Sequence, residues 1–88
     1  SGSAADKMGL MICSMGAYMQ VFAITHLPQV AAKGNAHYIV TKTFSGDRAG
    51  TDIRRISGRE RVNEIARMLS GSEITPEAVA NAEALLSR

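Results

Sequence analysis

The sequence has 88 residues, which is enough for one domain with a modest hydrophobic core. Ten basic and eight acidic residues give a formal charge of +2, which is too balanced to indicate binding to nucleic acid or membranes by bulk electrostatics. The single cysteine, Cys13, excludes an internal disulfide and favours a reducing compartment. No apolar run approaches the roughly 20 residues of a transmembrane helix, and no signal peptide is evident. We therefore expect a cytoplasmic protein.

Residues 3–17 are predicted to form a helix. An apolar stripe runs along it at positions i, i+3, i+4 and i+7, which are Met8, Met11, Ile12 and Met15. We expect this stripe to face the core, where methionine fills irregular gaps. Gly9 in the helix interior costs roughly 1 kcal/mol relative to alanine, which indicates that another stretch of backbone approaches closely there.

A continuous apolar run from Val21 to Ile24 predicts a strand over residues 20–25. Continuous rather than alternating hydrophobicity is typical of a parallel strand that is buried on both faces. A helix followed by such a strand is half of a βαβ unit, and we expect the preceding strand to lie outside this chain. A short helix over residues 28–33 follows, with Pro28 at its first position.

Residues 37–56 are predicted to form an antiparallel hairpin at a sheet edge, because two β-branched and aromatic runs flank a polar, glycine-containing turn. Two helices follow, over residues 58–70 and 76–87. Ser57 and the glutamate three residues later have the spacing of a capping box at the start of the first one. Thr75 is expected to cap the second, which has proline at its first position. Together these strands and helices indicate an α/β fold.

The sequence contains no complete catalytic or cofactor-binding motif. It has no phosphate-binding loop, no dinucleotide-binding glycine motif and no nucleophile elbow of the hydrolase type. One cysteine and two histidines give no set with zinc spacing, so we expect no metal site. His26 is the one positional signal, because ligands bind just past the carboxyl ends of buried parallel strands. An imidazole there could donate a hydrogen bond to a phosphate or orient a water molecule. The alternative is a histidine that is satisfied within a partly buried loop.

Two other polar features are expected at the surface. His37 opens the predicted edge strand and is expected to be exposed. A basic stretch consists of Arg54, Arg55, Arg59, Arg61 and Arg67. Acidic residues dilute it, several at the helical i, i+4 spacing that favours ion pairs, so a solvated face is a better interpretation than a DNA-binding face.

The loop around His26 and the following helices carry a family resemblance. The Thr-His-Leu-Pro-Gln-Val-Ala sequence at residues 25–31, after an apolar strand, resembles the RecN-type DNA repair ATPases, relatives of the structural-maintenance-of-chromosomes proteins. Residues 61–71 resemble the family's R-V-x-E-I-A-R-M-L-G-G helix, with serine in place of the first glycine of that pair. The first predicted helix resembles the one after the family's D-loop, whose end would fall at Ser1 and Gly2 if these residues are native. The resemblance spans essentially the whole chain and is closest to the Bacteroidetes branch.

The resemblance implies the α/β fold of an ABC-type P-loop ATPase head, with residues 1–88 as its C-terminal lobe and residues 25–28 as the switch loop (H-loop). His26 would be the switch histidine that contacts the γ-phosphate and helps to place the attacking water, with Thr25 beside it as a candidate nucleotide contact. ATP and Mg²⁺ are implied as ligands of the full-length protein, in which two heads sandwich two ATP molecules. The implied partners are a second head in a homodimer, the N-terminal lobe of the same protein, and DNA during repair at the nucleoid. No membrane partner is implied.

The phosphate loop, the signature motif, the Walker B aspartate and the catalytic glutamate are expected before residue 1. Phosphoryl transfer depends on Mg²⁺, lysine and backbone donors. We therefore predict that the full-length protein is an ATPase, whereas this chain alone binds no ATP and is inactive. Without its neighbouring strand, the chain should expose an apolar patch and a sheet edge. We therefore predict a dimer, formed by edge pairing or by exchange of the first helix. Two alternatives to a RecN-type lobe stay open. The chain could be a lobe of another ABC-type chromosome-maintenance ATPase, or a stand-alone module that binds DNA through the arginine-bearing face.

Overall fold

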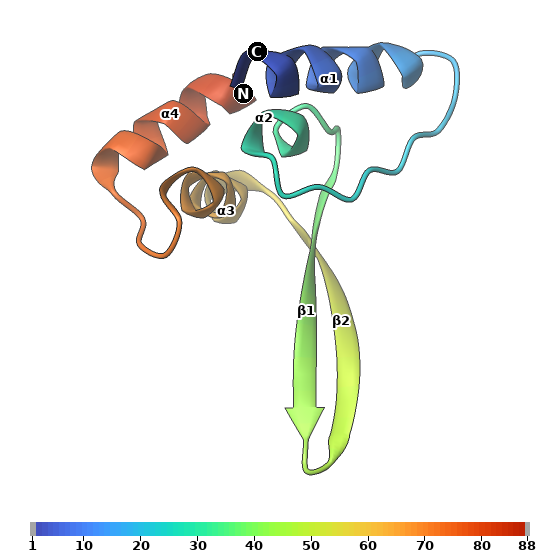
Figure 1. Cartoon of the computed structure of the whole chain (residues 1–88), viewed down its shortest axis with the longest axis vertical. Coiled ribbons are helices and arrows are strands. Elements are labelled where there is room, and N and C mark those ends of the chain that lie inside the picture. The colour runs from blue at the N-terminus through green and yellow to red at the C-terminus, as the bar shows by residue number, and fades with distance from the viewer. Residues whose placement is uncertain (1, 88) are drawn as a thin grey trace.

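The described part of the chain, residues 2–87, contains helices and one β-hairpin in this computed structural model (Figure 1). The helices are α1 (Gly2–Met15), α2 (Pro28–Ala31), α3 (Gly58–Ser70) and α4 (Pro76–Leu86). The strands are β1 (His37–Ser45) and β2 (Arg48–Ile56). Ser1, where the resemblance places the end of the D-loop, lies outside the described residues.

The predicted helices are present, with small shifts at their ends. The helix predicted over residues 58–70 has those bounds, and the one predicted over residues 76–87 ends one residue earlier. The two N-terminal helices, predicted over residues 3–17 and 28–33, each end two residues earlier. The residues that follow both of them form turns.

The core lies where α3 and α4 pack against each other and against the turn after α2. Its buried members are Ala32, Ile65, Ala66, Ala78 and Ala82. Val62 and Leu69 pack at its margin, as the i, i+3, i+4, i+7 spacing along α3 requires. Because most of these side chains are alanines, the two helix backbones can approach closely, and Ile65 is the only large side chain in the described chain that is fully buried.

Caps fix the ends of α3 and α4. The Thr75 hydroxyl accepts a hydrogen bond from a backbone amide in the first turn of α4 at 3.1 Å, which confirms the predicted cap. Gly71 has a φ of 90° and ends α3, because this left-handed conformation does not continue a helix. The capping box predicted at Ser57 is wrong, since its side chain makes no capping hydrogen bond. The glutamate that would complete the box, Glu60, pairs with Arg54 of β2 instead.

The strands β1 and β2 form the predicted antiparallel hairpin, which projects from the helices (Figure 1). Its register pairs His37 with Ile56 at the base and Ser45 with Arg48 at the turn. Residues directly opposite each other share a face, and one face carries exposed apolar side chains, which are Tyr38, Val40, Phe44 and Ile53. No third strand pairs with the hairpin within residues 2–87, so it is a two-stranded ribbon there.

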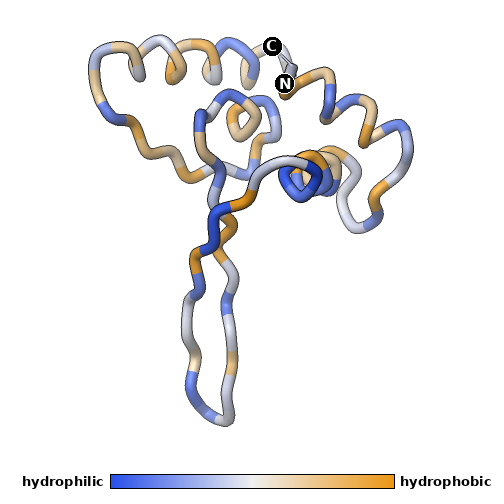
Figure 2. Tube along the Cα trace, turned by 180° about the vertical axis from the view of Figure 1, so that it is seen from behind, coloured by the Kyte–Doolittle hydropathy of each residue, from blue (hydrophilic) through white to orange (hydrophobic). Residues whose placement is uncertain are grey.

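Residues 20–25, predicted as a buried strand, form an irregular coil in this chain. Phe22 is 83% exposed and Ile24 is fully exposed. Figure 2 shows the apolar character of this coil, which runs from α1 to α2. The prediction is wrong here because a strand needs a neighbour to pair its backbone groups, and the described residues contain no strand beside this segment.

The methionine stripe of α1 does not face the core of this chain. The methionines of the stripe, Met8, Met11 and Met15, are at least 40% exposed, whereas Ile12 is partly buried. The prediction that these methionines are core residues is therefore wrong for the described residues, because α1 approaches the backbone of α2 at Gly9. A β-carbon added at Gly9 would lie 2.9 Å from the carbonyl oxygen of Gln29, which confirms the close backbone approach predicted at this glycine.

We predict that Gly9→Ala destabilises the chain by about 1–3 kcal/mol, the usual cost of overpacking. Alanine in place of an exposed helical glycine would instead be stabilising, so the sign of the change tests the contact between α1 and α2. Urea unfolding followed by circular dichroism measures it, with Ser14→Ala at an exposed position of α1 as the control. A Gly9→Ala variant that is as stable as the wild type would contradict this packing.

Candidate functional site

His26 lies in the loop that leads into α2, and its side chain is exposed. Thr25 shapes this loop, because its hydroxyl oxygen accepts a hydrogen bond from the Leu27 amide at 2.9 Å and closes a turn around the histidine. Within residues 2–87 no group forms a hydrogen bond or an ion pair with the His26 imidazole. The imidazole is therefore open to a ligand or to a neighbouring surface.

The short helix α2 fixes the loop on its carboxyl side. The Leu27 carbonyl accepts hydrogen bonds from the amides of Val30 at 3.1 Å and Ala31 at 3.0 Å. Pro28, at the first position of α2, is buried together with Val30. His26 therefore lies two residues before the start of a helix that buries two of its side chains. The helix begins at Pro28, as predicted from the preference of proline for the first helical position.

The other end of α2 is held by Arg61 of α3. Its Nη2 atom donates hydrogen bonds to the carbonyl oxygens of Gly34 at 2.7 Å, Ala31 at 3.1 Å and Ala32 at 3.4 Å. The last carbonyls of a helix lack partners within the helix, and a cation suits them because the helix dipole places partial negative charge there. Burial lowers the pKa of the Arg61 guanidinium, which nevertheless stays charged.

This contact corrects the interpretation of Arg61 as part of a solvated basic face. Sequence reasoning missed it because an arginine among other charged residues on a helix is usually solvated. The one available signal was position, since Arg61 opens the 61–71 segment that carries the family resemblance. No spacing rule connects that residue to a loop some 30 residues earlier in the chain.

The other arginines of the basic stretch mostly form ion pairs at the surface. These pairs are Arg54 with Glu60 at 2.7 Å, Arg59 with Glu83 at 3.5 Å, and Arg67 with Glu64. Exposed pairs of this kind contribute little to stability, but they neutralise the stretch. With Arg61 engaged by backbone carbonyls as well, most of these arginines have partners within the chain. The preference for a solvated face over a DNA-binding face stays a prediction.

His37 lies at the base of the hairpin and is partly buried, so the expectation of an exposed side chain is wrong. Its Nδ1 atom is buried and has no hydrogen-bond partner in the described chain. Burial lowers the pKa of His37, and the positive charge of Arg61 lowers it further, whereas Glu64 acts in the opposite direction. The folded chain therefore favours the neutral imidazole of His37.

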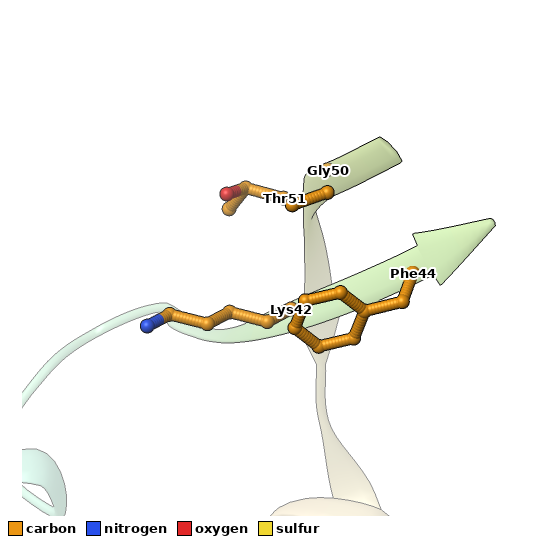
Figure 3. A pocket seen from close by; sticks show the side chains of 5 residues that line it. Lys42, Phe44, Gly50 and Thr51 are labelled. Atoms are coloured by element: carbon orange, nitrogen blue, oxygen red, sulfur yellow. The ribbon is translucent and has the colours of Figure 1, made fainter. Parts of the chain in front are cut away.

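No group of three histidine, cysteine, aspartate or glutamate side chains in the described residues could hold a metal ion. A hollow of about 240 Å³ lies on the hairpin and is lined by Lys42, Phe44, Ala49, Gly50 and Thr51 (Figure 3). It is open and carries a single charged side chain, so it lacks the converging polar groups of a ligand site. No helix among residues 2–87 is both long and apolar enough to cross a membrane.

Comparison with known proteins identifies the segment that this chain resembles. No protein-family model matches it. The chain is similar over nearly its whole length to DNA repair proteins named RecN. The DNA repair protein RecN of Xylella fastidiosa (strain 9a5c) is 45% identical over 85 residues, which are 97% of this chain and 15% of that protein. The RecN proteins of Streptomyces coelicolor and Vibrio cholerae are 40% and 37% identical over 97% and 98% of this chain, respectively.

The chain spans about 15% of the length of these RecN relatives. Because the similarity covers nearly all of the chain, it supports the resemblance found at residues 25–31 and 61–71. The chain is therefore similar to a segment of RecN proteins. Its helices and antiparallel hairpin are compatible with the C-terminal part of an ATPase head.

We predict that His37 makes the chain less stable as the pH falls below its ordinary pKa of 6.5. The unfolded chain takes up a proton on His37 near that value, whereas the folded chain takes it up only at lower pH, so protonation in this window favours unfolding. His37→Gln should remove this part of the pH dependence, measured by urea unfolding at about pH 7.5 and about pH 5.5. The control is His26→Gln, which should retain it because His26 is exposed and lies on another segment. The same pH dependence in His37→Gln as in the wild type would contradict this role.

Proposed function

We propose that this chain is the C-terminal lobe of a RecN-like ATPase head and that His26 is its switch histidine. The observation that carries the proposal is the exposed His26 imidazole, on a loop held by Thr25 and α2. Support comes from the 45% identity between this chain and a segment of a RecN protein. In this proposal the whole protein hydrolyses ATP during DNA repair and recombination, in the cytoplasm and at the nucleoid. The Bacteroidetes origin stays a prediction.

The chemistry proposed for His26 is positioning. Its imidazole would donate a hydrogen bond to the γ-phosphate of ATP and help to place the attacking water. Catalysis of phosphoryl transfer depends mainly on positioning of the reactants and on stabilisation of charge. A histidine on a fixed loop would contribute to the positioning. The Mg²⁺, lysine and backbone donors that stabilise the charge belong, in this proposal, to the Walker and signature motifs elsewhere in the parent protein.

Thr25 acts, in this proposal, mainly by shaping the loop. Its hydroxyl oxygen accepts the hydrogen bond from the Leu27 amide, which leaves its O–H proton available as a donor to a bound nucleotide. The sequence carries no phosphate-loop motif, and no group of three histidine, cysteine, aspartate or glutamate side chains among residues 2–87 could hold a metal ion. In this proposal the chain contributes His26 to a composite site that the whole protein completes.

The apolar surface of the chain supports its place in a larger assembly. Exposed large side chains gather on α1 and the coil after it, and they are Met8, Leu10, Met11, Met15, Tyr18, Met19, Phe22 and Ile24. Exposed apolar patches mark interaction surfaces. We propose that the N-terminal lobe of the same protein covers this surface and pairs with residues 20–25. A second head and DNA are proposed as partners of the whole protein.

We predict that the isolated chain forms a dimer through this apolar surface. Light scattering over a range of concentrations measures its mass. The double variant Met11→Lys, Phe22→Lys should shift it to a monomer, because burying two unpaired charges opposes association. Asn81→Lys, at an exposed position of α4, is the control and should remain dimeric. A wild-type chain that stays monomeric at every concentration would argue against the prediction.

We predict that His26→Ala in the whole parent protein abolishes most ATP turnover while ATP binding is retained. Loss of a group that acts in the transition state lowers kcat more than it weakens substrate binding. Steady-state hydrolysis and equilibrium binding of a fluorescent ATP analogue measure the two quantities. Asn35→Ala, in the exposed turn after α2, is the control. Wild-type turnover in His26→Ala would leave His26 as a structural loop residue.

We also predict that the 88-residue chain alone has no ATPase activity. The reason is that one imidazole cannot stabilise the charge that develops on the transferred phosphoryl group. Phosphate release from ATP by the purified chain, compared with the chain carrying His26→Ala, measures this. Turnover that depends on His26 in the isolated chain would contradict the composite site.

A further inference from the structure

The helix α2 is too short to hold its own position. It has four residues, about one turn, and isolated helices of this length are unstable in water. Its last carbonyl groups have no partner within the helix. Contacts from outside α2 therefore decide where it lies, and with it the loop that carries His26.

Two neighbours make these contacts. Gly9 of α1 lies against the backbone of α2 in a contact without hydrogen bonds. Arg61 of α3 makes directional contacts, because one of its nitrogen atoms donates to three carbonyl oxygens at the end of α2 and in the turn after it. Hydrogen bonds from a cation are roughly twice as strong as neutral ones. Arg61 therefore supplies the directional contacts at the carboxyl end of α2, where Gly9 packs against Val30 and Lys33 without such contacts.

Arg61 is itself fixed by the core. It lies one helical turn before Ile65, which is fully buried, and one of its acceptors, Ala32, belongs to the same buried cluster. At the other end of α2, the Leu27 carbonyl accepts hydrogen bonds from the Val30 and Ala31 amides. A continuous series of contacts thus runs from the core through Arg61 and α2 to the residue next to His26.

We propose that Arg61 is a positioning residue that holds the His26 loop where the imidazole meets the γ-phosphate. The proposal rests on the proposed function of His26, because Arg61 acts on the reaction only through α2 and the loop. Loss of Arg61 would leave the carbonyls of Ala31, Ala32 and Gly34 without their cationic donor. The carboxyl end of α2 would then loosen, and His26 would be misplaced.

Three variants of α3 separate this role from a general effect on the helix. Arg61→Gln removes the cation and shortens the side chain. Arg61→Lys keeps a cation with three N–H donors on one nitrogen, and a single nitrogen makes all the wild-type contacts, so it should restore much of the function. Arg59→Gln is the matched control, because Arg59 lies on the same helix but makes only a surface ion pair.

The experiment measures ATP hydrolysis by the whole parent protein carrying each variant, together with His26→Ala. We expect Arg61→Gln to lower kcat by about 10-fold to 100-fold, in line with the effect of small misplacements of a reacting group, while the KM for ATP stays within about twofold. Arg61→Lys should recover most of the lost kcat, and Arg59→Gln should match the wild type. Wild-type kcat in Arg61→Gln, with His26→Ala inactive, would overturn the positioning role and leave the proposed function intact. Wild-type kcat in His26→Ala would overturn the proposed function itself.

Hydrogen exchange of the same proteins gives a second readout that does not depend on activity. In Arg61→Gln the amides of residues 27–34 should exchange faster, while those of α3 and α4 exchange as in the wild type. Equal acceleration throughout α3 and α4 would mean that Arg61 supports the fold as a whole, and it would overturn the specific role. Unchanged exchange over residues 27–34 would overturn it as well.

Discussion

The placement of α2 between two neighbours is the constraint on which the candidate site depends. On one side, only a glycine at position 9 lets the backbone of α1 approach it. On the other side, the guanidinium of Arg61 satisfies carbonyls that α2 cannot satisfy itself. The helix has a single turn, yet these two contacts determine its position. The His26 loop is held in turn, because the carbonyl of Leu27, the next residue in the chain, accepts hydrogen bonds from amides of α2.

Elements with local determinants could be predicted from the sequence, whereas those that need a distant partner could not. Helices α3 and α4 follow from their apolar spacing, and α4 also from the cap at Thr75. The hairpin follows from two β-rich runs around a glycine-containing turn. Residues 20–25 have an equally clear strand pattern, but that pattern describes burial against another strand, and the described residues provide none. The methionines of α1 are exposed because the helix contacts α2 at Gly9 instead.

The same distinction holds for the residues of the candidate site. His26 could be proposed from the resemblance that covers the adjoining residues. The positional argument fails in the described chain, because the apolar run before His26 is an exposed coil and not a buried strand. Arg61 could not be proposed, because its partners are backbone carbonyls that carry no side-chain signature in the sequence. The prediction that His37 is exposed is wrong for a related reason. The start of an edge strand is usually exposed, but here it lies near α3. Contacts between side chains and a distant backbone emerge only from the folded chain.

The irregular coil over residues 20–25 has a thermodynamic consequence for assembly. Any neighbour that pairs with this segment must order it, which costs about 1–2 kcal/mol of conformational entropy per residue. One end of the segment is already preorganised by the turn at Thr25 and by α2. The affinity of such a neighbour therefore depends on how this chain restrains the segment, as well as on the area that the two surfaces bury. A neighbour that orders residues 20–25 would then extend the order that Thr25 and α2 already give to the residues beside His26.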